Sequence, residues 1–109
     1  MTPEPEASLP APSTSLPPAT PRFPLGRCVA TPAALDALRS QNLSPWDLLN
    51  RHRRGDWGDV CAADAQVNEQ ALHLGHRLLS IYTLPDGQRL YLLTEADRSV
   101  STLLLPGEH

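Results

Sequence analysis

The chain has 109 residues, with 12 acidic and nine basic side chains and a formal net charge of −3. This length supports one domain. The charge argues against a broad DNA-binding surface, because such a surface needs a cationic face that displaces counterions from phosphates. The first residues are acidic and lack an apolar segment, and no apolar run reaches membrane-spanning length. We therefore expect a cytoplasmic protein without a secretory signal or membrane contact.

Prolines concentrate near the N-terminus. Eight of the 12 prolines lie within residues 1–24, among alanine, serine and threonine. Such a segment buries too little apolar area to offset its loss of conformational entropy. We predict a disordered leader with polyproline II character over residues 1–22. A single small α+β domain follows over residues 23–109.

The folded part is predicted to begin with a strand and a helix. The strand lies within "LGRCVAT", residues 25–31. Thr31 is the predicted N-cap of the helix. Pro32 suits the first helical position, where its missing N–H has no partner to lose. The helix is expected over residues 32–41 and ends near Asn42.

A second helix is predicted within residues 43–55. Ser44 and Asp47 form an S-x-x-D capping box, and Gly55 suits the left-handed position after the last turn. The last turn carries Arg51, His52, Arg53 and Arg54. Cations are stabilised at the negative end of a helix dipole, so this basic run has a structural explanation. Phosphate binding is the alternative.

A third helix is expected from about Val60 to Leu74, with Asp59 as its N-cap. The stripe predicted to face the core consists of Val60, Val67, Ala71 and Leu74. "GDWGD", residues 55–59, is then the connection between two helices. Trp57 is expected to pack under that joint.

Three runs of strand length complete the chain. They are "RLLSIYTL", "QRLYLLTE" and "SVSTLLLP", joined by turns at "PDG" and "EADR". Apolar residues occupy both alternating faces of these strands. This pattern predicts a sheet with one face against the helices and the other partly covered, for which a second subunit is one cover. The predicted fold is β-α-α-α-β-β-β, with a C-terminal antiparallel meander and the first strand added at an edge.

Several polar side chains are candidates for chemistry. The carboxylates are Asp56, Asp59, Glu95 and Asp97, with His52 and Arg98 near them in the sequence. If the interhelical loop met the "TEADR" turn, they would form a hard-cation site or an acid/base pair. The alternative, which we favour, is that they are capping and turn residues.

Signals for other chemistry are weak. A Cys61–His52 nucleophile pair is conceivable, because a helix N-terminus lowers the pKa of a thiol. His73 and His76 lack further ligands at metal-binding spacing, so we assign no metal ligands. Nucleotide-binding and hydrolase motifs are absent from the sequence, and we expect no cofactor.

Three segments resemble a family of small proteins from plasmids and integrative conjugative elements of proteobacteria. They are "FPLGRCVATPAAL", "RGDWGDVCAADAQVNEQAL" and "LYLLTEADRSVSTLLLP". The resemblance covers residues 23–109 and implies a bacterial, cytoplasmic protein borne on a mobile element. It implies no activity. The polar residues at matching positions, together with one tryptophan and one glycine, are Trp57, Gly58, Asp59, Asn68, Glu95, Asp97, Arg98 and Ser99.

We predict a small non-enzymatic accessory or regulatory protein that acts through protein–protein contact or self-association. The candidate surface joins "GDWGD" and "TEADR" and comprises Trp57, Asp59, Asn68, Glu95, Asp97 and Arg98. Trp57 is the candidate aromatic anchor, and a buried Trp57 would contradict that role.

Two alternatives remain open at this point. The first is a metal-assisted hydrolase or nuclease-like toxin. It would use Asp59, Glu95 and Asp97 as ligands, His52 as base and Arg98 to stabilise charge. The second is a nucleic-acid-binding regulator. It would use Arg51, Arg53 and Arg54.

Overall fold

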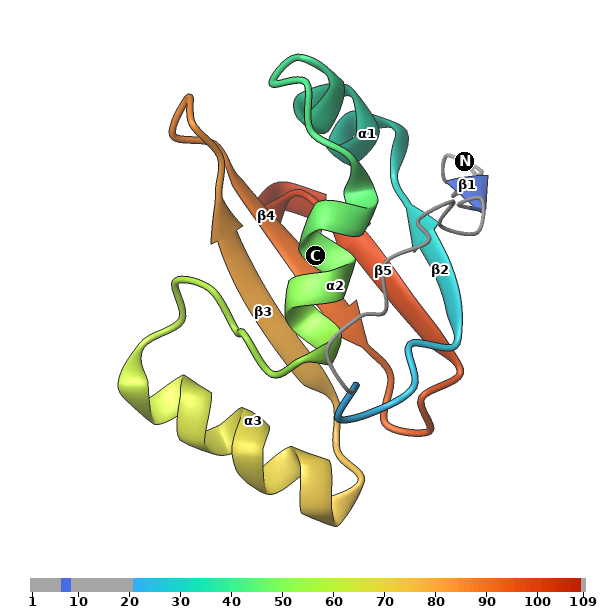
Figure 1. Cartoon of the computed structure of the whole chain (residues 1–109), viewed down its shortest axis with the longest axis vertical. Coiled ribbons are helices and arrows are strands. Elements are labelled where there is room, and N and C mark those ends of the chain that lie inside the picture. The colour runs from blue at the N-terminus through green and yellow to red at the C-terminus, as the bar shows by residue number, and fades with distance from the viewer. Residues whose placement is uncertain (1–6, 9–20, 109) are drawn as a thin grey trace.

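The computed structural model describes residues 7–8 and 21–108 (Figure 1). Its elements are β1 (Ala7–Ser8), β2 (Arg27–Ala30), α1 (Pro32–Arg39), α2 (Pro45–Arg53), α3 (Ala62–Leu74), β3 (Leu78–Thr83), β4 (Arg89–Thr94), β5 (Val100–Leu104) and the 3-10 turn η1 (Pro106–Glu108). The predicted α+β order is confirmed from β2 to β5. Most of the predicted disordered leader lies outside the described residues. Within it, residues 7–8 instead form β1.

The strands form one mixed sheet in the order β1-β2-β5-β4-β3. Strands β3, β4 and β5 pair antiparallel, which confirms the predicted meander. Strand β2 joins β5 in parallel, and β1 pairs antiparallel with the outer side of β2. A parallel pair needs a long crossover connection, which the three helices between β2 and the meander provide.

The first two helices begin where local chemistry predicts. Thr31 accepts a hydrogen bond from the backbone N–H of Ala34, and a proline opens α1. Ser44 and Asp47 form the complete capping box of α2. These caps satisfy backbone donors that the first turn of a helix leaves without partners.

The third helix differs from its prediction in two ways. Cys61, not Asp59, is its N-cap residue, and no side chain caps it. The predicted core stripe is also wrong in part, because Val67 and Leu74 are 59% and 64% exposed. The buried residues of α3 are Asn68 and Ala71. The helix is rotated so that Asn68 reaches the backbone of β3.

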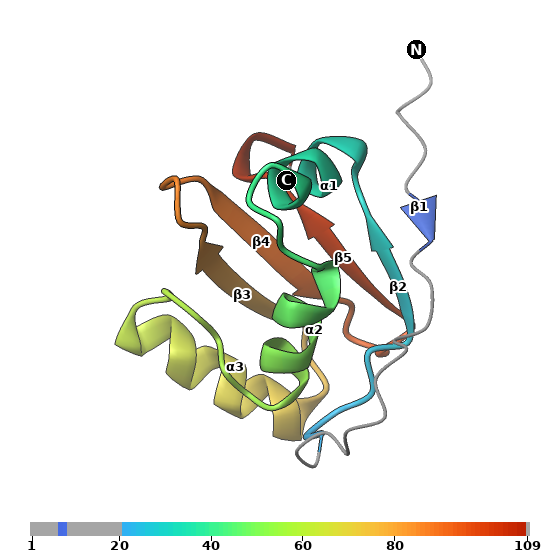
Figure 2. The same cartoon turned by 45° about the horizontal axis from the view of Figure 1, so that its top comes forward.

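Two helices cover one face of the sheet, and the third lies along its β3 edge. Helices α1 and α2 lie over one face, and α3 runs along the β3 side (Figures 1 and 2). The main core lies beneath α1 and α2 and includes Leu38, Leu49, Leu78, Leu92 and Leu103, each with no exposed area. None of the helices within residues 21–108 is long and apolar enough to cross a membrane.

The strand register assigns each side chain to a face. Cross-strand partners share a face, so Ser80, Leu92 and Leu103 lie together against the helices. The intervening residues point to the other side, where the structure places no α-helix of residues 21–108 (Figure 2). We call this side the open face. Its half-buried residues are Leu79, Ile81, Tyr91, Leu93, Val100 and Thr102, whereas Val29 and Leu104 on the same side are buried.

Candidate functional site

The "GDWGD" segment runs alongside β3 as a short arch. The Trp57 carbonyl accepts from Ile81 N–H at 3.1 Å, and Asp59 N–H donates to the Ile81 carbonyl at 2.6 Å. The Asp59 carboxylate then accepts from Thr83 N–H at 3.1 Å. Asp59 is therefore bound to β3 and does not cap α3. The arch satisfies backbone groups at the edge of the sheet.

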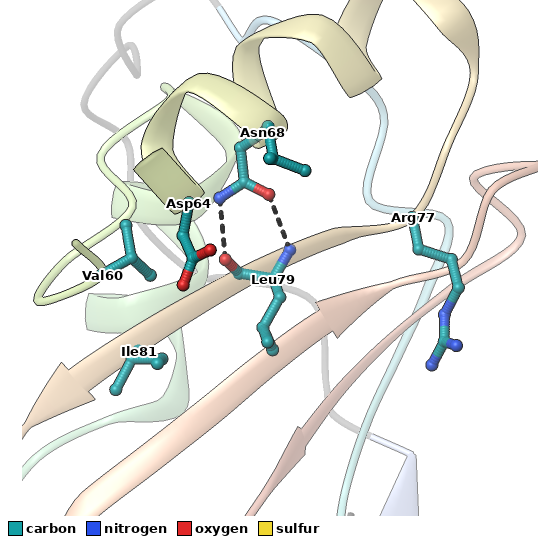
Figure 3. Close-up of a pocket in the computed structure, with 7 residues that line it drawn as sticks. Val60, Asp64, Asn68, Arg77, Leu79 and Ile81 are labelled. Atoms are coloured by element: carbon teal, nitrogen blue, oxygen red, sulfur yellow. Dashed lines mark hydrogen bonds between the residues drawn. The ribbon is translucent and has the colours of Figure 1, made fainter. Parts of the chain in front are cut away.

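Asn68 continues this closure of the β3 edge. Its amide donates to the Leu79 carbonyl at 2.8 Å and accepts from Leu79 N–H at 3.1 Å (Figure 3). The side chain thus imitates a neighbouring strand at one residue. It is 4% exposed, so the amide belongs to the fold and not to a free surface. An edge closed in this way cannot pair with another strand.

Trp57 points inward from the arch. It is 6% exposed and stacks on Phe23 at 6.2 Å between ring centroids. Its indole N–H donates to Glu69 at 2.9 Å, and Arg22 holds the same carboxylate through two hydrogen bonds. These bonds from Arg22 and Trp57 lower the pKa of Glu69. Packing under the joint is as expected. Because the ring is buried, Trp57 is not available as a surface anchor.

Arg98 fastens the "TEADR" turn to the end of α3. It has a left-handed backbone, with φ of 61°. Its guanidinium donates to the carbonyls of Ala71 at 3.0 Å, His76 at 2.6 Å and Glu95 at 3.1 Å. A cation at the C-terminus of a helix is stabilised by the unpaired carbonyls there. The guanidinium therefore serves the fold.

The candidate carboxylates lie at opposite ends of β3. Asp59 binds Thr83 at the end of the strand, whereas Glu95 follows Thr94, which pairs with Leu78 at its start. The five residue steps between these ends span about 16 Å. In the described part of the chain, no three His, Cys, Asp or Glu residues are placed to hold a metal ion. The geometry that the hydrolase interpretation requires is not formed.

His52 is the most buried polar residue of α2 and is part of a hydrogen-bonded chain of buried side chains. The chain passes from Ser80 through His52 to Thr94 and Ser101, and ends at the Leu25 carbonyl. The carbonyl can only accept, so Ser101 donates to it at 2.7 Å and accepts from Thr94 at 2.7 Å. Each hydroxyl has one proton to give. Proton donation along this series of hydrogen bonds therefore runs in one direction, toward the Leu25 carbonyl.

That direction fixes the protonation of the imidazole. Thr94 accepts from Nε2 of His52 at 2.9 Å, and Nδ1 accepts from Ser80 at 2.5 Å. This assigns the neutral ring with its proton on Nε2. Burial, and then the charge of Arg98, lowers the pKa of His52 to about 3. With no exposed area and both nitrogens occupied, His52 is not a base for substrate or for Cys61.

The basic run is engaged with its own chain. Arg51 pairs with Asp56 at 2.7 Å and lies 4.7 Å from the ring centroid of Tyr82. Arg54 donates to the Asn50 carbonyl at 3.0 Å. These contacts agree with a structural role for the end of α2. They leave fewer free cations for the nucleic-acid interpretation.

A groove lies between α3 and the sheet. Its volume is about 190 Å³ and it is lined by Val60, Asp64, Val67, Asn68, Arg77, Leu79 and Ile81 (Figure 3). Leu79 and Ile81 also belong to the open face, so groove and face form one surface. We call this combined surface the docking surface. Sequence reasoning anticipated the face from two-sided apolar strands. It missed the groove, because it placed Val67 in the core.

The arrangement brings no reactive groups together among residues 21–108, but it offers an apolar surface with charges at its rim. Comparisons with family models, with curated proteins and with solved structures gave no match.

Proposed function

We propose that this chain is a non-enzymatic binding protein that acts through protein–protein contact at the docking surface. The observation that supports this proposal is the apolar row on the open face. Leu79 pairs with Leu93, Leu93 pairs with Thr102, and Ile81 pairs with Tyr91. Contiguous apolar surface on a small protein typically marks an interaction site.

The remainder of the interpretation rests on the resemblance of the three sequence segments. It makes the chain an accessory or regulatory protein of a bacterial mobile element. The proposed surface differs from the one that the sequence indicated. It uses the leucines of β3 and β4 instead of Trp57, which contributes to the core. An open sheet face needs no moving part to bind a partner.

The test begins with affinity capture from a bacterial host, with the immobilised chain as bait. Each captured protein is then purified and titrated against the chain by calorimetry. We expect Leu93→Arg to abolish binding, because it places a charge in the centre of the row. Asp36→Arg on α1 also introduces an arginine, but on the helix layer, and should bind normally. A partner that binds Leu93→Arg as tightly as wild type would overturn the proposal.

A further inference from the structure

The groove part of the docking surface is lined by two charges of opposite sign, on either side of Leu79. Asp64 lies on α3 toward Val60 and Ile81, and Arg77 lies at the other end, just before β3 (Figure 3). Asp64 makes no ion pair with any residue of the described ranges. Arg77 has one loose contact, 3.8 Å from Glu95, with both side chains about half exposed. Both charges are therefore available to a partner.

Such a surface is complementary to itself. In a two-fold interface, residue i of one copy contacts residue j of the other, and j contacts i. A two-fold axis that crosses β3 at Leu79 exchanges the two ends of the groove. It therefore sets each Asp64 against the Arg77 of the other copy. Leu79 and Leu93 share one cross-strand row, so each would meet its own counterpart.

We infer that the partner at the docking surface is a second copy of this chain. The two open faces pack against each other as in a β-sandwich, and the two Asp64–Arg77 pairs flank the leucines. This inference rests on the proposed function, because it names the occupant of the same surface. It requires no strand exchange, since the β3 edge is already closed by the arch and by Asn68.

The size of the surface places the dimer among small interfaces. Four strands about 4.8 Å apart and five residues long cover a footprint of about 300 Å². A flanking helix about 10 Å wide raises this to nearly 500 Å². Stable complexes bury about 800 Å² on each partner, so this dimer is at the weaker end. We expect a dissociation constant in the micromolar range.

The experiment is sedimentation equilibrium of the full chain from about 1 µM to about 1 mM, which brackets the affinities of small interfaces. Wild type should pass from monomer to dimer. Asp64→Arg should raise the dissociation constant by about tenfold or more, because two arginines then face each other. The double variant Asp64→Arg/Arg77→Asp should restore it. Asp36→Arg makes the same charge change on the helix layer and should leave it unchanged.

Circular dichroism checks that each variant is folded, which both exposed sites should permit. A chain that stays monomeric up to the highest concentration would overturn the inference. So would a dimer that Asp64→Arg does not weaken, or a double variant that fails to recover. A monomeric chain that still binds a different protein through Leu93 would overturn the inference while the proposed function stands.

Discussion

On the helix-covered face, β3 and β4 present Ser80 and Thr94 to the ring of His52, whereas on the open face the same strands present Leu79 and Leu93. The hydroxyls are completely buried and the leucines are partly exposed. Polarity alone therefore does not say which side of this sheet is interior. The hydrogen-bonded chain requires one placement of α2 over the strands, since a shifted helix would leave buried polar groups without partners.

Among the substitutions that leave a folded protein, the largest effect is expected from removing the imidazole at the centre of the covered face. His52→Ala leaves the hydroxyls of Ser80 and Thr94 without their partner and opens a cavity beside Phe23 and Trp57. The free energy of unfolding should fall by about 4 kcal/mol. Urea denaturation measures the change. His73→Ala, at an exposed position of α3, should change it by less than about 0.5 kcal/mol. A loss below about 1 kcal/mol for His52→Ala would contradict a structural role.

The arch should be nearly as sensitive. Gly58 has φ of 72°, and a Cβ there would collide with the Ile81 carbonyl oxygen. Gly58→Ala should therefore lower the free energy of unfolding by about 3 kcal/mol. Gly87 has a similar φ of 90° but open space around it. Gly87→Ala should lose only about 1 kcal/mol. If both variants lost the same free energy of unfolding, the loss at Gly58 would come from backbone strain and not from the close approach to β3.

Mild acid should test the neutral histidine. The folded pKa of His52 is lowered from 6.5 to about 3, so the unfolded chain takes up the proton first. This contribution to stability is complete above pH 6.5 and is lost as the pH falls toward 3. The slope approaches 1.4 kcal/mol per pH unit, or about 2 kcal/mol between pH 6.5 and 5. Denaturant unfolding across that window measures it. His52→Gln does not titrate, so its stability should be nearly constant there. A wild-type curve equally flat would contradict the assignment.

The smallest effect on folding is expected on the open face. Leu93→Arg should change the free energy of unfolding by less than about 1 kcal/mol, because its side chain already contacts solvent. The neighbouring Leu92 has no exposed area and faces the helices. Leu92→Arg should therefore prevent folding, because it buries an unpaired charge. Thermal unfolding should show a cooperative transition for Leu93→Arg and none for Leu92→Arg. The absence of a transition in both variants would mean that the open face is also buried.

Two features that depend only on neighbours in sequence were predictable. The caps at Thr31 and Ser44 need only residues within the first turn, and both formed as expected. The orientation of α3 was not predictable in this way. Apolar periodicity predicted that Val67 faces the core. The helix is instead positioned by the hydrogen bond from Asn68 to the Leu79 carbonyl of β3, 11 residues further along the sequence.

The candidate site shows the same limit more strongly. His52 looked like part of a basic helix end, because its partners Ser80 and Thr94 are 28 and 42 residues away. Nothing in one sequence reports that these three side chains meet. Asp59 and Glu95 were grouped because their loops are both acidic. The length of β3, which separates them, became relevant only once the pairing of the strands was known.

The closed edge of β3 also limits the stoichiometry of assembly. A sheet that grows by adding strands can extend without end, as fibres do. Here the arch and Asn68 already occupy Leu79 and Ile81 on that side, so growth along the hydrogen-bonding direction stops. When two copies associate face to face, each face is covered and cannot bind a further copy. Because the sheet cannot grow past β3, association on that side should stop at a fixed, small number of copies, even at high protein concentration.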